Sequence, residues 1–278
     1  MSNISQINTN IQALVSQSSL NSVNNKLAET QLQLSTGLRI NRAEDDAAGF
    51  SIASKLTSRI EGLDQALRNV GDGKSVLDIA ETGMNSINDI LVDMKAKAVQ
   101  GANATLGDVE RGFIEEQLVA LQDEIDNIAG ATTFQGIQLL DDGVGDVALT
   151  FQVGETSADT IDITLAQTTA ATLTVDTTTL DGTDATTFNA FIDTVDAAIE
   201  TLAGNFNQIG IDQSKLSIRE DNLDQAITSN SAARSRIQDA DFAKVQSESI
   251  RLQILQQTAT SALAQANSSP QSVLGFLG

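Results

Sequence analysis

The sequence predicts a mainly α protein: a long antiparallel helical bundle, a terminal α-helical coiled coil formed by both chain ends, and a small β-hairpin-rich region at the outer end. Long stretches toward both ends repeat apolar residues every three or four positions, which is helix spacing. The 278 residues include one proline, Pro270, so proline breaks no helix before it. Alternating and β-branched segments occur only in the middle of the chain.

The composition excludes several classes of function. The formal net charge of −21, from 16 basic and 37 acidic side chains, argues against nucleic acid and anionic membranes as partners. Cysteine and histidine are absent, which excludes disulfides, Ser–His dyads and imidazole metal sites, so we expect no cofactor and no metal. No apolar run is long enough to span a membrane. The first thirty residues hold one basic residue and no apolar core segment, so we expect no secretory signal peptide.

The N-terminal segment predicts a helix with a thin apolar stripe that changes phase partway. Few charges flank the stripe, which suggests packing on several sides within an assembly, although an ordinary amphipathic helix in one bundle has the same pattern. The stripe residues are Ile4, Ile7, Ile11 and Leu14, and then, out of phase, Leu20, Val23, Leu27 and Leu34.

A polar run follows Gly37 and interrupts the helical pattern. Asn41 with Glu44 three residues later is typical of a capping box that opens a second helix. Asp45 and Asp46 would then lie in the first turn, where the helix dipole favours carboxylates. A catalytic carboxylate pair is the alternative, but no third catalytic group accompanies it.

The next segment predicts one long helix from about Asp45 to Gln100. Its apolar seam has no gap from Leu77 to Ala98. After a turn around residues 101–107, a third helix over 114–128 is expected to pack antiparallel on the second.

The middle of the chain is acidic and predicts short strands. Residues 112–214 contain 18 acidic and no basic side chains, which predicts a solvated surface. We expect strands at 147–153, 161–165 and 172–175. Helix spacing returns at Phe188, and Gly204 and Gly210 suggest a break between two helices, the second of which continues into the C-terminal segment.

The C-terminal segment predicts another helix with one thin stripe. Such a helix has little reason to be stable alone, because each exposed Leu forgoes about 1.5–3 kcal/mol of burial. The obvious partner is the N-terminal helix. The stripe residues are Val245, Leu252, Leu255, Ala259, Ala262 and Ala266.

Residues 34–49, LSTGLRINRAEDDAAG, resemble the N-terminal signature of bacterial flagellins, the subunits of the flagellar filament. The resemblance resumes in TTFQGIQLL at 132–140 and in ARSRIQDADF at 233–242. It ends with QILQQ at 253–257 and the segment after it. The match covers both ends and most of the middle of the chain.

This resemblance implies a structural subunit, not an enzyme, that polymerises as a homopolymer into an extracellular filament used for motility. Residues 1–43 with 236–278 would form the coiled-coil filament core, and 44–140 with 187–235 the helical bundle. Residues 141–186 would face outward, and the large outer domains of many flagellins would be absent. The implied partners are the flagellar type III export apparatus, an export chaperone, and the capping and hook-associated proteins.

The resemblance also implies particular sites. Arg39, Arg42, Asp45 and Asp46 match the family motif at the bend, where they suggest intersubunit contacts; local capping and ion pairing is the alternative. Some family members are ligands of an innate immune receptor through the surface of the long helix. Asp93 stands where an Arg is expected, and the charge reversal predicts weaker recognition. The residues that match this surface are Leu91, Asp93, Lys95 and Glu124.

Three other interpretations remain open at this point. A hook–filament junction protein would have the same architecture. An enzyme in the acidic middle would have to rely on carboxylates or a carboxylate-bound cation. A soluble coiled-coil adaptor would form discrete oligomers instead of filaments.

Overall fold

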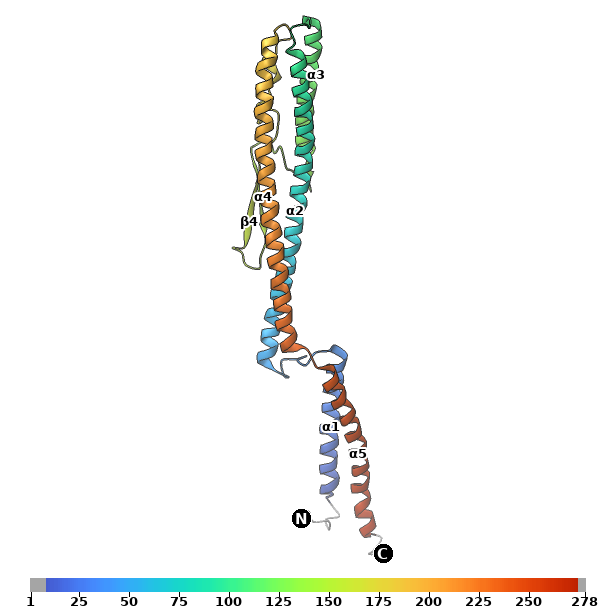
Figure 1. Cartoon of the computed structure of the whole chain (residues 1–278). Helices are drawn as coiled ribbons and strands as arrows, with labels where there is room; N and C mark the ends of the chain where they lie inside the picture. Colours follow the sequence, from blue (N-terminus) through green and yellow to red (C-terminus); the bar gives the residue numbers. More distant parts are fainter. Residues whose placement is uncertain (1–8, 275–278) are drawn as a thin grey trace. The chain divides into compact units, whose positions relative to one another are not determined.

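The computed structural model describes residues 9–274, with side chains up to residue 269, so the predicted stripe residues Ile4 and Ile7 lie outside it (Figure 1). The prediction of a mainly α fold with small β hairpins is confirmed. Within the described residues the α-helices are α1 (Ile11–Thr36), α2 (Ala47–Gly101), α3 (Asp108–Ala131), α4 (Ala185–Gln238) and α5 (Phe242–Leu274).

The chain divides into two compact units. Unit 1 comprises Met1–Arg59 with Ser229–Gly278, and unit 2 comprises Ile60–Thr228. The domain boundaries that the sequence suggested, at 43/44 and 235/236, stay a prediction.

Unit 2 has a continuous apolar core along α2. The gapless seam of α2 supplies its centre, and Leu77, Met84, Leu91 and Ala98 are all 0 % exposed. Buried side chains of α3 and α4 belong to the same cluster, and α3 runs back along α2 (Figure 1). At the end of α2, a Cβ on Gly101 would lie 2.4 Å from the ring of Phe188, so only glycine fits this contact.

Two antiparallel hairpins accompany the helices of unit 2. Strand β1 (Thr133–Phe134) pairs with β2 (Ile137–Gln138), and β3 (Val147–Gln152) pairs with β4 (Thr160–Leu165). The predicted strands around 147–153 and 161–165 are thus confirmed. The β3–β4 hairpin packs against α2, where the Asn69 amide donates to the Gln152 carbonyl at 2.9 Å.

The predicted strand at 172–175 is wrong. Residues 172–175 pair with no strand. Instead, side chains of α3 bind the backbone on either side of this segment. The Asp126 carboxylate accepts a hydrogen bond from the Ala170 amide at 2.8 Å, and the Gln122 side-chain oxygen accepts one from the Thr177 amide at 3.0 Å. Leu173 and Val175 are nevertheless buried. The alternating pattern therefore predicted correctly that these side chains are buried, but predicted wrongly that the backbone pairs with a strand.

The predicted helix break at Gly204 and Gly210 is also wrong. Helix α4 is continuous through both glycines, and the chain instead leaves the helix at residues 239–241. A glycine inside a helix costs about 1 kcal/mol relative to alanine. Burial of Leu202, Ile209 and Leu216 around these positions outweighs that cost.

We predict that Leu91→Ala destabilises unit 2 by about 2–5 kcal/mol, because it leaves a cavity in a fully packed seam. Val92→Ala is the matched control, since Val92 is 52 % exposed and its loss should change the free energy of unfolding by less than about 0.5 kcal/mol. Urea denaturation followed by circular dichroism measures both. Equal effects of the two substitutions would contradict the assignment of the core.

Candidate functional site

The two terminal helices pair with each other in unit 1 (Figure 1). The pairing is antiparallel, and side-chain hydrogen bonds mark it at two levels. Near the start of α1, the Asn10 amide donates to the Ala266 carbonyl at 2.7 Å, and further along the Gln256 amide donates to Asn24 Oδ1 at 2.8 Å. These contacts agree with the prediction that the N-terminal and C-terminal helices pair with each other.

The surface between α1 and α5, the inner seam, consists of positions that alternate in steps of three and four residues on both helices. That heptad spacing keeps one face of each helix toward the other. The inner seam comprises the buried or half-buried residues Ala13, Ser16, Leu20, Val23, Leu27, Thr30 and Leu34 on α1, and Val245, Ser249, Leu252, Gln256, Ala259, Leu263 and Ala266 on α5.

The inner seam buries little apolar surface. On α1 only Leu27 and Thr30 are fully buried, and Thr30 is polar and bonds its own helix at the Lys26 carbonyl. On α5 the buried residues include Ser249, and Leu252 is the one large apolar side chain among them. The pair therefore has far less hydrophobic stabilisation than the core of unit 2.

The predicted stripe residues divide between two faces. The second-phase residues of α1 lie in the inner seam, as do Val245, Leu252, Ala259 and Ala266. Ile11 and Leu14 are instead 53 % and 60 % exposed, and Leu255 and Ala262 are also exposed. At 100° per residue, Ile11 and Leu14 lie opposite the seam, which explains the change of phase seen in the sequence.

A second apolar surface, the outer stripe, therefore lies on the faces of α1 and α5 that do not contact each other. Sequence reasoning missed Val15, Ile250 and Ile254. The i, i+4 spacing of Ile250 and Ile254, out of phase with the seam, was the available signal. The outer stripe consists of Ile11, Leu14, Val15, Ile250, Ile254 and Leu255, each 43–60 % exposed.

The bend after α1 ties both ends of the chain together. Gly37 adopts φ +72°, the left-handed conformation that favours glycine, and its amide donates to the Gln33 carbonyl to end α1. The following residues then pair with the segment between α4 and α5. The Arg39 amide donates to the Gln238 carbonyl at 2.6 Å, and the Ala240 amide donates to the Gly37 carbonyl at 2.9 Å.

The predicted capping box at Asn41 and Glu44 is wrong. Helix α2 begins at Ala47, and Asp46 caps it by accepting from the Gly49 amide at 3.0 Å. Asp45 and Asp46 thus precede the first turn instead of lying in it. Residues 41–45 form a turn at the bend and do not begin a helix.

The four bend candidates all have partners within the chain. The Arg39 guanidinium donates to the Ile237 carbonyl at 2.5 Å, and Arg42 forms an exposed ion pair with Glu44 at 2.9 Å. Asp45 Oδ2 accepts from the Arg42 and Asn41 amides, each at 2.9 Å. These two hydrogen bonds, that of Arg42 first, hold the pKa of the Asp45 carboxyl below its ordinary value.

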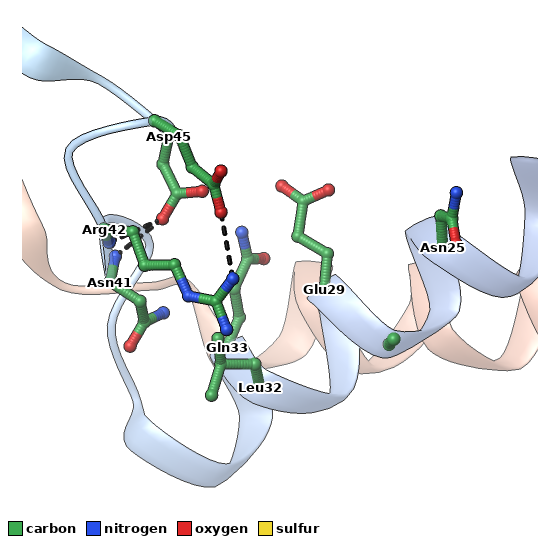
Figure 2. A pocket seen from close by; sticks show the side chains of 9 residues that line it. Asn25, Glu29, Leu32, Gln33, Asn41, Arg42 and Asp45 are labelled. Atoms are coloured by element: carbon green, nitrogen blue, oxygen red, sulfur yellow. Dashed lines mark hydrogen bonds and ion pairs between the residues drawn. The ribbon is translucent and has the colours of Figure 1, made fainter.

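A polar groove lies between α1 and the bend, and Figure 2 shows Arg42, Asp45 and Glu29 around it. Three of its four charged side chains, Glu29, Glu44 and Asp45, are acidic and one, Arg42, is basic, so its formal charge is −2. A group on a neighbouring protein could meet both donors and acceptors there. Its walls are formed by Asn25, Ala28, Glu29, Leu32 and Gln33 of α1 and by Asn41, Arg42, Glu44 and Asp45 of the bend.

The residues that match the family's receptor surface lie in unit 2 in different environments. Leu91 is 0 % exposed and belongs to the core, so a partner cannot reach it while unit 2 is folded. Asp93 is exposed. Lys95 pairs with Asp196 across α2 and α4, and Glu124 is exposed and accepts from Asn127.

Other kinds of site find no support among residues 9–274. No group of three or more acidic side chains there is placed to hold a metal ion. In the same part of the chain, no helix is long and apolar enough to cross a membrane.

We predict that the Asp45 hydrogen bonds make the bend sensitive to acid. Because the folded pKa is lowered, the stabilisation is complete above the ordinary carboxyl pKa of about 3.9 and is lost as pH falls through the lowered value. The amide chemical shifts of Asn41 and Arg42 should move with a midpoint below that ordinary value, and Asp45→Asn should abolish the transition. A midpoint at or above the ordinary value would contradict the assignment.

Two family models match the chain. The model for the bacterial flagellin N-terminal helical region matches residues 7–144, and the model for the C-terminal helical region matches residues 192–277. Together they cover α1 to α3 with the first hairpin, most of α4, and α5.

Similar proteins agree with these models. A flagellin of Halalkalibacterium halodurans is 36 % identical over 271 residues, which are 98 % of this chain and 99 % of that one. A Salmonella typhimurium flagellin is 42 % identical over 171 residues, 62 % of this chain but 34 % of that longer one. The crystal structure of Bacillus cereus flagellin is 27 % identical, with a TM-score of 0.42 over 59 % of this chain and 88 % of that one. The near-complete match to a relative of similar length shows that this chain belongs to the bacterial flagellins, the structural subunits of the flagellar filament.

Proposed function

We propose that copies of this chain polymerise by burying the outer stripe of α1 and α5 against the terminal helices of neighbouring copies. The observation that carries this proposal is that each terminal helix has two apolar faces, whereas pairing within the chain covers one. In the paired helices, Leu14 and Ile254 are still 60 % and 59 % exposed. Apolar faces of this kind on otherwise polar helices are typical of interaction surfaces.

The energetics favour coupling between ordering and assembly. Burying the exposed half of each outer-stripe side chain would contribute about 1 kcal/mol per residue. The thin inner seam offsets little of the conformational entropy that is lost when two long helices become ordered. We therefore infer that the terminal helices are disordered or only marginally ordered in the monomer and become stable when copies stack, which makes growth cooperative.

Contacts of this kind generate a filament when they join different surfaces of successive copies without closing into a ring. In this arrangement residues 1–43 with 236–278 form the filament core, 44–140 with 187–235 surround it, and 141–186 face outward. The acidic, Thr-rich middle of the chain suits the solvent-facing position. The bend residues Arg39, Arg42, Asp45 and Asp46 add polar contacts between copies.

The finer points of localisation follow from the same family membership. We propose that the chain leaves the cell unfolded through the flagellar export apparatus, with an export chaperone, and that it meets the capping and hook-associated proteins at the filament ends. A marginally stable terminal unit suits export of this kind, because little folding free energy has to be overcome there. Because the flagellins are a structural family, we also propose that the chain has no enzymatic role.

The hook–filament junction protein is not favoured as an alternative. Both matching family models describe flagellin, and a relative that is matched over 99 % of its own length is a flagellin. For the innate immune receptor, we propose weak recognition, because exposed Asp93 carries a negative charge where the family motif has a positive one.

The test is to place charge on the outer stripe. We expect the double variant Leu14→Asp with Ile254→Asp to keep unit 2 folded but to form no filaments, because assembly would bury unpaired carboxylates. Negative-stain electron microscopy across a concentration series measures this.

The matched control is Gln17→Asp with Gln253→Asp, which adds the same two charges to exposed positions beside the stripe. We expect this control to form filaments like the wild type. If both double variants polymerise equally, the outer stripe is not the assembly surface.

A further inference from the structure

Charge is distributed very unevenly between the two units. Unit 1 contains 9 basic and 7 acidic residues, whereas unit 2 contains 7 basic and 30 acidic residues. Their formal charges are therefore +2 and −23, so the net negative charge of the chain, −21, comes entirely from unit 2. Copies that pack in a filament must bring these acidic bundles close together, which costs electrostatic free energy.

Four of the nine basic residues of unit 1 lie at the start of α2 and the end of α4. Residues 47–60 and 225–238 contain four basic residues and no acidic one. The two stretches lie against each other, since Arg234 Nη1 contacts Thr57 Oγ1 at 3.5 Å. We call this set the basic collar: Lys55, Arg59, Arg234 and Arg236.

Helix dipoles account for only part of the collar. Arg236 lies in the last turn of α4, where a cation is favoured, and donates to the Ala232 carbonyl of its own helix. Lys55 lies in the third turn of α2, near the end of that helix where the dipole favours anions instead. The dipole acts mainly within the first turn, so it does not account for the basic residue at this position.

The collar has the composition of a contact surface. Ile52 is 50 % exposed and shares one face of α2 with Lys55 and Arg59, at spacings of three and seven residues. Lys55 and Arg236 are both exposed. An apolar centre with a charged rim is the usual arrangement of a protein–protein interface.

We propose that the basic collar of one copy docks on the acidic unit 2 of a neighbouring copy. This inference rests on the proposed polymerisation and names an electrostatic contact that holds it together. Charge complementarity selects the occupant, because every copy brings a positive collar of four residues and an acidic unit of −23. Nucleic acid and anionic membranes are poorer occupants, since the net charge of −21 repels them.

The experiment compares two charge reversals of equal net charge. Lys55→Glu with Arg236→Glu reverses the collar, and Arg68→Glu with Lys97→Glu reverses two basic residues of unit 2. At about 0.05 M salt, we expect the collar variant to raise the critical concentration for assembly about tenfold above that of the control, because exposed attractions become repulsions. At about 1 M salt, where the screening length is about 3 Å, the two should converge.

The outcomes separate this inference from the proposed function. If the wild type forms no filaments, polymerisation itself fails. If the wild type polymerises and the collar variant has the same critical concentration as the control at low salt, the collar contact is refuted. A higher critical concentration of the collar variant that persists unchanged at high salt would also refute it. Loss of binding to phosphatidylglycerol vesicles by a collar variant that assembles like the control would assign the collar to a membrane surface instead.

Folding is controlled within the same experiment. Circular dichroism of both reversed variants should match the wild type. The neutral variant Lys55→Gln with Arg236→Gln should show an intermediate, salt-dependent rise in critical concentration. A neutral variant with wild-type assembly at low salt would also refute the contact.

Discussion

Each terminal helix of this protein has apolar residues on two opposite faces, and the chain supplies one partner helix for each. Pairing of α1 with α5 buries the inner seam and leaves Leu14 and Ile254 in solvent. No rearrangement of this pair can bury both faces at once, because the faces lie on opposite sides of the helix. The unit can therefore complete its hydrophobic burial only against another molecule, and family membership makes a further copy of the chain the natural partner.

Unit 2 differs because it has a continuous apolar core of its own. Its core runs along α2 from Leu77 to Ala98 without an exposed position in the seam, and α3, α4 and the hairpins cover it. Under the proposed function, stability and assembly therefore belong to different parts of the chain. Most of the negative charge belongs to the stable unit, which keeps free subunits apart in solution, whereas the nearly neutral terminal unit can pack closely.

The sequence predicted elements well where one strong pattern acted alone. The gapless seam of α2 and the β-branched runs of β3 and β4 were found because burial and periodicity agreed. It failed where tertiary contacts decided. Packing overrode Gly204 and Gly210, and α3 side chains replaced a partner strand beside Leu173. At the bend, Asp46 caps α2 instead of Asn41. Both residue types are good helix caps and they lie within six residues, so the sequence alone did not decide between them. In the terminal helices, two overlapping stripes hid Ile250 and Val15, since each was out of phase with the seam.

The central claim is that the terminal helices depend on neighbouring copies for their order. Amide hydrogen exchange, compared between dilute monomer and assembled filament, tests it most directly. The account predicts rapid exchange along α1 and α5 in the monomer, slow exchange there in the filament, and equally slow exchange along the α2 core in both. Strong protection of α1 and α5 in the dilute monomer, at the level of the α2 core, would contradict it.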